Sequence, residues 1–294
     1  MDNQVRERVQ NFLSGVSQIP TLPDVYLKVK KAFEDPTMSV EYLSDAIRFD
    51  QALTVSLLRL ANSPLFGYRA KISSINQAIM LIGLRELYSL VLSVSVMGLF
   101  PIKEDEKTSL YPARKYWEQS IATAVTARTI ASMMNYPRPD ELFVAGLIHD
   151  IGILMEKMYL GEKFTQICQK ARDSHRFLID VEAEELGFTH AEVGQLLTET
   201  WQFPHLLVLT TGHHHQPQRV TEDAITMDAV AIVHVAEAIV RSMDIGWFGD
   251  QLMTPVDLES IKRLHLVPWP DMDVILSKIS KEYNMAIDAL MNAN

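Results

Sequence analysis

The sequence predicts an all-α protein. Apolar residues recur at intervals of three and four along most of the chain, the period of a helix that buries one face. Glycine is scarce, with 12 in 294 residues, whereas the helix-favouring Leu, Ala, Glu and Met are abundant. No run of alternating strand-type residues with hairpin turns occurs, so a β-sheet is not expected.

Four amphipathic helix faces follow one another in the first third of the chain. Ser74 is expected to cap the fourth helix, with Gln77 reaching back as in a capping box. Asp35-Pro36 and Ser63-Pro64 interrupt the pattern between helices. The four faces are formed by Val25, Val29 and Phe33, by Val40, Leu43 and Ile47, by Leu53, Leu57 and Ala61, and by Ile75, Ala78, Ile79 and Ile82.

The segment Leu84–Phe100 is apolar on most sides, which is typical of a helix at the centre of a bundle. The next segment, Pro101–Pro112, is charged. It is either a boundary after an N-terminal helical layer or a solvated connection with no further role. We expect three parts: an N-terminal helical part over residues 1–108, a helical core over 109–243, and C-terminal helices over 244–294 that pack on that core.

The remaining helices are expected from the same periodicity. A long helix is predicted at Ala113–Met134, and another at about Pro139–Met158 that carries His149-Asp150. Further helices are predicted near Phe177–Leu186, Thr189–Thr200, Pro204–Gly212, Asp223–Met243, Val256–Arg263 and Met272–Met291. Trp247-Phe248 and Trp269 are expected to pack within the C-terminal part or to form an interface.

Composition restricts the class of protein. The net charge is −10, from 27 basic and 37 acidic residues, which argues against a broad nucleic-acid-binding surface. Cys168 is the single cysteine, so an intrachain disulfide is impossible and a reducing compartment is favoured. The N-terminus lacks the apolar core of a signal peptide, and the longest apolar stretch, around Leu87–Phe100, is too short to span a bilayer. We therefore expect a cytoplasmic protein without membrane attachment.

Histidines and acids gather in the second half of the chain. His149 stands beside Asp150 in an otherwise apolar helix, and His190 follows Thr189, which with Glu192 forms a second capping box. The run His213-His214-His215 precedes Pro217, and His234 and Glu237 share a helix face. Imidazoles and carboxylates on several helices can converge in a bundle core and bind a divalent metal ion. Such an ion activates water toward a phosphoester.

Plainer interpretations stay open for these residues. A single histidine in an apolar helix is more often a hydrogen-bonded core residue than a metal ligand. The run of three histidines is equally explained by capping of a helix C-terminus, where cations are favoured, and His213 has the least specific context.

Several segments match one known family in order and at the expected spacing. They are LPDVYLKVKKAFEDPTMSVEYLSDAI, LLRLANSPLFG, ISSINQAIMLIGLRELYSL, KYWEQSIATAVTA, AGLIHDIGIL, FTHAEVGQLLTETWQFPHLLVLTTGHHHQP and IVHVAEAIV. From about Ile19 to Val240 the chain resembles HDOD domains, the HD-related output domains of bacterial signalling proteins. This resemblance implies a multi-helix HD-like bundle with an N-terminal helical layer, and a role in signal transduction.

The resemblance also implies a ligand set. The related HD and HD-GYP phosphohydrolases use a histidine, a His-Asp pair, further histidines and a final aspartate. In this chain His149 and Asp150 match the pair, His190 the next histidine, and His214 and His215 the paired histidines. Glu237 stands in place of the final aspartate. These six residues are the predicted ligands of one divalent ion, with Fe, Mn, Zn, Mg and Ni all compatible.

Three features depart from the catalytic relatives. Gln119 stands where the first histidine is expected, and its carbonyl oxygen is a weaker ligand for a transition metal than imidazole. Ile153 occupies the place of a lysine that often follows the His-Asp element, and the Gly-Tyr-Pro motif is absent because Gln216-Pro217 follows the histidines. These departures make a two-metal centre less expected than a single ion.

Two hypotheses follow. The first is a non-catalytic signalling module that binds a protein partner or a nucleotide-type ligand and retains a metal ion in a degenerate site. The second is a metal-dependent phosphohydrolase acting on nucleotides or cyclic dinucleotides, in which Asp150 is catalytic.

Overall fold

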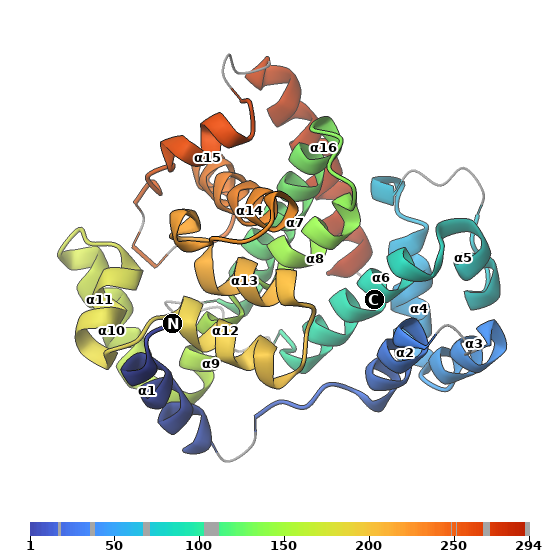
Figure 1. Cartoon of the computed structure of the whole chain (residues 1–294), viewed down its shortest axis with the longest axis horizontal. Helices are drawn as coiled ribbons and strands as arrows, with labels where there is room; N and C mark the ends of the chain where they lie inside the picture. The colour runs from blue at the N-terminus through green and yellow to red at the C-terminus, as the bar shows by residue number, and fades with distance from the viewer. Residues whose placement is uncertain are drawn as a thin grey trace. The chain divides into compact units, whose positions relative to one another are not determined.

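The computed structural model describes residues 1–16, 19–35, 39–66, 71–102, 112–247, 249–250, 252–266 and 271–291. Helices and their connections make up these residues, and no strand occurs among them, which confirms the expected all-α fold. The chain divides into two compact units, whose helices are labelled in Figure 1. Unit 1 comprises Met1–Ile19 and Ile102–Pro270, and unit 2 comprises Pro20–Pro101 and Asp271–Asn294.

This grouping differs from the three parts expected from the sequence. Helix α1 (Asn3–Ser14) packs on α12 (His190–Thr200) within unit 1 and buries Val9 and Leu13. Helix α16 (Met272–Leu290) packs on α4 (Gln51–Ala61) and belongs to unit 2. Periodicity shows which face a helix buries, but it does not show which helix receives that face.

Unit 2 is built around α6, the apolar segment expected at the centre of a bundle. Helix α6 buries residues on most of its sides and contacts α2, α4 and α5. The hydroxyls of Tyr26 and Tyr88 are 2.8 Å apart in this core, and Phe33 stacks on Tyr88. The elements of unit 2 are α2 (Asp24–Glu34), α3 (Val40–Arg48), α4, the short η1 (Pro64–Phe66), α5 (Ile75–Ile82), α6 (Leu84–Leu99) and α16.

Unit 1 carries all of the predicted ligands. Its core is formed by α7, which packs on α8 and α14, and by α12, which packs on α9 and α13. The elements of unit 1 are α1, α7 (Ala113–Met133), α8 (Pro139–Ile148), α9 (Ile151–Leu160), α10 (Glu162–Asp173), α11 (Leu178–Leu186), α12, α13 (His205–His213), η3 (Pro217–Arg219), α14 (Ala224–Ser242) and α15 (Leu258–Arg263).

The single helix predicted over Pro139–Met158 is wrong. Helix α8 ends at Ile148 and α9 begins at Ile151, because Asp150 has a ψ angle of 17°, which leaves the helical conformation. The amide of Ile153 then bonds to the Asp150 carbonyl at 2.9 Å. Neither residue at the break, His149 or Asp150, is a proline or glycine, so the apolar periodicity continues through it.

The predicted helix caps are largely confirmed. Thr189 and Glu192 form a complete capping box at the start of α12. Ser74 accepts from the Gln77 amide as the N-cap of α5, but the Gln77 side chain reaches back to the amide of Ser73 instead of Ser74. Helices α1 and α10 were not predicted from the sequence, although both bury an apolar stripe.

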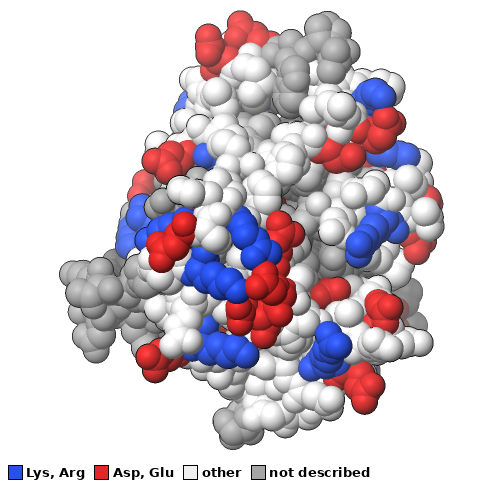
Figure 2. All heavy atoms as spheres, turned by 90° about the vertical axis from the view of Figure 1, so that its left-hand side faces the viewer, with Lys and Arg blue, Asp and Glu red and all other residues white. Residues whose placement is uncertain are grey.

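Charges of both signs alternate on the face of the protein seen in Figure 2. Lys170 of α10 bonds to Glu184 of α11 at 2.7 Å, and Glu184 also accepts from Arg176 at 2.5 Å. Exposed pairs of this kind contribute little to stability. Among the described helices, none has the length and apolar character needed to cross a bilayer. Most of the charged segment after Pro101, together with Phe248 and Trp269, lies outside the described residues.

Candidate metal centre

The predicted ligands come together inside unit 1 from four parts of the chain. The His149-Asp150 pair lies at the α8–α9 junction, and His190 is the first residue of α12. His214 and His215 follow α13. Glu237 lies on α14. All of these side chains are buried except His215, whose side chain retains 13% exposure.

The helix break is what makes the His149-Asp150 pair useful. Adjacent residues of a continuous helix point in different directions, so both could not face one centre. The break at Asp150 lets both side chains turn the same way, with His149 Nε2 and Asp150 Oδ2 3.2 Å apart. Gly152 brings the next ligand close: a Cβ at this position would overlap the carbonyl oxygen of His190, so α9 and α12 can approach only with glycine here.

Each of three imidazoles has its Nδ1 atom fixed by an acceptor. His149 Nδ1 lies 2.8 Å from the Gly146 carbonyl oxygen, and His214 Nδ1 lies 2.9 Å from that of Thr211. His190 Nδ1 lies 2.6 Å from the carboxylate of Glu182. Because carbonyl and carboxylate oxygens only accept, each Nδ1 carries the proton. This arrangement directs the Nε2 atoms inward and is the usual environment of metal-binding histidines.

The inward atoms converge on Asp150. Asp150 Oδ1 lies 3.3 Å from His190 Nε2 and 3.2 Å from His214 Nε2, and His190 Nε2 lies 2.9 Å from His215 Nε2. Ligands of a tetrahedral ion with bonds of ~2.05 Å are separated by about 3.3 Å. The spacing therefore fits an ion held by Asp150, His190, His214 and His215, which we call the four-residue set.

Unpaired buried atoms support the same conclusion. His149 Nε2, His214 Nε2, Asp150 Oδ1 and Glu237 Oε2 have no hydrogen-bond partner among the described residues. Acceptor atoms that face one another at about 3 Å in a buried site need a cation between them, either a proton on an imidazole or a metal ion. The residues present therefore fit a divalent metal ion.

The electrostatics of the cluster reflect this need for positive charge. Burial alone would raise the pKa of Asp150, but the imidazoles of His149, His190 and His214 hold it well below its usual range. Burial alone would lower the pKa of His190, but the carboxylates of Glu182 and Asp150 raise it. The anionic groups thus outweigh the cost of burying charge.

Two further ligand-type residues form a smaller group with His214. His149, His214 and Glu237 place their candidate ligand atoms close together, and we call them the three-residue set. The site therefore contains two groups that share His214. Glu237 also lies near His215, with Glu237 Oε2 3.8 Å from His215 Nδ1.

Gln119 does not act as sequence reasoning suggested. Its amide nitrogen, rather than a carbonyl oxygen, faces the cluster: Nε2 donates to Asp150 Oδ2 at 2.9 Å. Asp150 thus directs Oδ1 toward the four-residue set and Oδ2 toward Gln119 and His149.

The structure adds four residues that the sequence did not indicate. Arg241 donates to Glu237 Oε1 at 3.0 Å and to Asp250 Oδ1 at 2.9 Å, and Asp250 also accepts from the Leu178 amide at the start of α11. Behind His190, Glu182 and Glu156 are both fully buried. Arg241 lies four residues after Glu237 in the sequence, a spacing that predicts contact on one helix face. The contacts of Asp250, Glu182 and Glu156 join segments that are distant in the sequence, so spacing could not predict them.

The remaining histidines are structural or peripheral. His234 Nδ1 lies 2.7 Å from the His214 carbonyl oxygen, and its Nε2 accepts from the Asp257 amide at 2.9 Å. His234 therefore links α14 by a hydrogen bond to the segment that carries His214 and His215. His213 lines a different cavity, next to α1.

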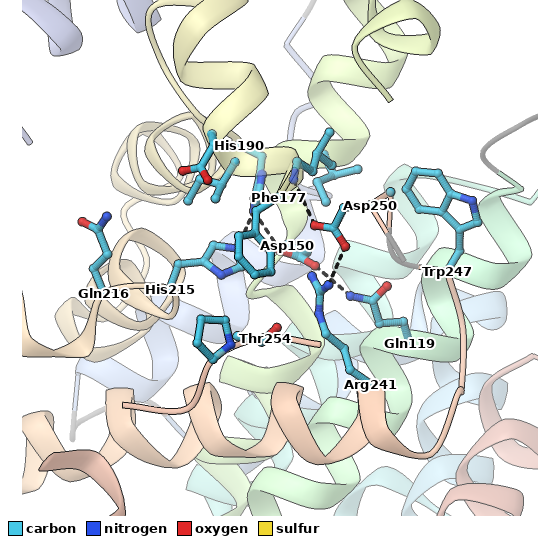
Figure 3. Close-up of a pocket in the computed structure, with 16 residues that line it drawn as sticks. Gln119, Asp150, Phe177, His190, His215, Gln216, Arg241, Trp247, Asp250 and Thr254 are labelled. Carbon is cyan, nitrogen blue, oxygen red and sulfur yellow. Dashed lines mark hydrogen bonds and ion pairs between the residues drawn. The ribbon is translucent and has the colours of Figure 1, made fainter. Parts of the chain in front are cut away.

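A cavity of about 180 Å³ opens beside the four-residue set (Figure 3). His190, His215 and Gln216 lie on one side of it, and Gln119, Arg241 and Asp250 lie on the other, with Asp150 between. The aromatic rings of Phe177 and Trp247 also line it. A small ligand in this cavity could therefore reach the candidate metal ligands directly.

Solved structures resemble this chain over nearly its whole length. An HDOD domain protein of unknown function from Geobacter sulfurreducens is 25% identical, with a TM-score of 0.78 and coverage of 98% of this chain and 99% of that chain. A candidate phosphohydrolase from Shewanella amazonensis SB2B is 20% identical, with a TM-score of 0.70 and coverage of 95% and 96%. A candidate signal transduction protein from Marinobacter aquaeolei VT8 is 18% identical, with a TM-score of 0.71 and coverage of 99% and 64%. The last two likenesses concern the fold alone.

Sequence comparison gives the family. An uncharacterised protein from Treponema pallidum (strain Nichols) is 26% identical over 248 residues, which are 83% of this chain and 46% of that protein. The chain thus spans about half the length of this curated relative. The HDOD domain model matches residues 19–217, which include the His-Asp pair and all three of His190, His214 and His215. The chain therefore belongs to the HDOD domain family.

Proposed function

We propose that this chain is a signal-transduction module that holds one divalent metal ion in the four-residue set and acts by binding other molecules, without turning over a substrate. One observation carries the metal assignment. The inward Nε2 atoms of His190 and His214 face a carboxylate oxygen at 3.2–3.3 Å, while their Nδ1 protons are committed to other acceptors. When bound, a divalent ion would supply the positive charge that these buried groups lack and polarise a water or an anionic ligand.

The ligand types limit the ion. Three imidazoles and one carboxylate suit Zn, Fe, Mn or Ni better than Mg, which prefers oxygen ligands. The absence of turnover is proposed because Gln119 supplies a hydrogen-bond donor to Asp150 in place of the imidazole of the catalytic relatives.

The binding partner is proposed as a signalling protein or a nucleotide-type ligand. The net charge of −10 favours basic surfaces on a protein partner and disfavours nucleic acid. For a small molecule, the cavity of about 180 Å³ is below the ~300–1,000 Å³ of most ligand sites. It would take a phosphate or one end of a larger ligand.

A phosphohydrolase is the alternative function. It is favoured by the position of the cavity, which reaches Asp150, His190 and His215 directly. In that case Asp150 would hold both the ion and its activated water.

Metal analysis and hydrolysis assays separate the two functions. Purified full chain would be analysed for bound metal and then assayed on nucleotides and cyclic dinucleotides with added manganese or iron. We expect about one ion per chain and no turnover. Turnover that Asp150→Ala abolishes would contradict the non-catalytic proposal. Well-folded protein that binds no ion under any of these conditions would contradict the metal assignment.

A further inference from the structure

The three-residue set differs from the four-residue set in what surrounds its carboxylates. Asp150 Oδ2, which faces this set, accepts from the Gln119 amide at 2.9 Å. Glu237 Oε1 accepts from Arg241 Nε at 3.0 Å, and the Arg241 side chain is only 9% exposed. In this half of the site, donors of the protein itself bind one oxygen of each carboxylate, whereas Glu237 Oε2 has no hydrogen-bond partner among the described residues.

The segment after α14 holds these donors in place. We call the described residues 245–247, 249–250 and 252–257 the strap. Gly246, with a φ of +98°, lies directly on Gln119, because a Cβ there would be within 3 Å of the Gln119 Cβ, Cα and N atoms. Asp250 of the strap accepts from Arg241 Nη1 at 2.9 Å, and the Leu252 carbonyl accepts from the same atom at 3.0 Å. Figure 3 shows Gln119, Arg241, Asp250 and Trp247 together on one side of Asp150.

The charges explain why one cation suffices here. Glu237 is fully buried, and a buried carboxylate requires a compensating positive charge. Arg241 lies one helical turn away on α14, and its fixed guanidinium supplies that charge together with a hydrogen bond. Like charges at short range repel strongly in a buried site, so a divalent ion beside this guanidinium is opposed.

We infer that Arg241 is the built-in cation that replaces a second metal ion, and that with Gln119 it restricts the centre to one ion in the four-residue set. Arg241 is in this sense a residue that determines metal stoichiometry. The inference rests on the proposed metal function of the four-residue set, but it makes a separate claim about the three-residue set. It also predicts that restoring histidine at position 119 is not enough to restore a second ion.

The test counts Mn²⁺ ions per full chain by elemental analysis after dialysis, and distinguishes isolated from paired ions by electron paramagnetic resonance. Wild type and Gln119→His are both expected to bind one isolated ion. The double variant Gln119→His/Arg241→Gln is expected to bind two ions with an exchange-coupled spectrum. The matched control Gln119→His/Arg241→Lys keeps the positive charge and is expected to remain at one ion.

The outcomes distinguish the two proposals. A wild type that binds no Mn²⁺ overturns the proposed function. A wild type with a coupled pair of ions overturns the Arg241 inference and leaves the metal function standing. A folded double variant that stays at one ion, as its lysine control does, also overturns the inference alone. Circular dichroism establishes folding of each variant, and a coupled pair of ions in the wild type overturns the inference even where a variant does not fold.

Discussion

Glu156 offers the sharpest test of the electrostatics behind the metal centre. Its carboxyl is fully buried, and neither oxygen has a hydrogen-bond partner among the described residues. Burial and the neighbouring charge of Glu182 raise the pKa of Glu156 well above its ordinary value near 4.5. Glu156 is therefore expected to be a neutral acid in the folded protein at pH values at which the unfolded chain has already ionised it.

The sign of the effect follows from proton binding. Above pH 4.5 the unfolded chain has lost the Glu156 proton and the folded chain retains it, so raising the pH favours unfolding. Between the unfolded and folded pKa of Glu156, each pH unit of increase lowers the free energy of unfolding by about 1.4 kcal/mol. Glu156→Gln has the same shape and cannot ionise, so the variant is expected to lose this dependence. Its stability relative to wild type should rise by about 1.4 kcal/mol between pH 5 and pH 6.

Urea unfolding of metal-free protein at pH 5, 6 and 7 measures this difference. Glu162→Gln is the matched control, because Glu162 is an exposed residue on the neighbouring helix α10. Its stability difference from wild type should not change with pH. If Glu156→Gln and wild type show parallel pH dependence over this range, Glu156 is not a buried neutral acid and the charge assignment behind His190 is incorrect.

Three further outcomes follow from the geometry of the centre. Glu182→Gln should weaken metal binding roughly 10-fold in calorimetric titration, because Glu182 orients His190. The control Glu192→Gln, at the same helix start, should lower the free energy of unfolding by about 1 kcal/mol without changing metal affinity. Equal metal affinities for wild type and Glu182→Gln would contradict the role of Glu182. A metal ion at 100 times its Kd should stabilise the fold by about 2.7 kcal/mol, and chelation should therefore lower the Tm by roughly 5 to 10 °C, while an unchanged Tm would argue against a bound ion. Asp150→Ala should destabilise the metal-free protein by about 3 kcal/mol in urea unfolding, and a change near zero would show that the buried contacts of Asp150 contribute nothing.

The sequence predicted the helices and the members of the histidine–acid cluster better than it predicted their surroundings. The HDOD resemblance selected His149, Asp150, His190, His214, His215 and Glu237, and the structure brings these residues together. The resemblance could identify residues that lie together because residue type and chain order are local properties of the sequence. The break between α8 and α9 was missed because nothing local marks it, yet it is this break that turns His149 and Asp150 toward one centre.

What the sequence could not predict depends on contacts between distant segments. Gln119 was interpreted as a weak oxygen ligand, but the orientation of an amide is decided by its neighbours, and here Asp150 accepts from the nitrogen. The grouping of α16 with unit 2 and the bond between Asp250 and the start of α11 likewise join residues far apart in the chain. Periodicity and spacing contain no information on such pairings.

The two halves of the candidate centre show why buried carboxylates need compensating donors or cations. Asp150 and Glu237 would remain as buried carboxylates after the loss of an ion, and each would then be strongly destabilising without a compensating donor. Gln119 donates to Asp150 Oδ2 and the Arg241 guanidinium donates to Glu237 Oε1, whereas Asp150 Oδ1 and Glu237 Oε2 have no hydrogen-bond donor among the described residues. Glu237 has the permanent positive charge of Arg241 bonded to it, whereas Asp150 accepts from a neutral amide, so an exogenous cation has most to contribute beside Asp150 in the four-residue set. For this reason we expect metal affinity to depend on His190 and His215 far more than on Glu237, a ranking that alanine variants of the three residues would test directly by calorimetry.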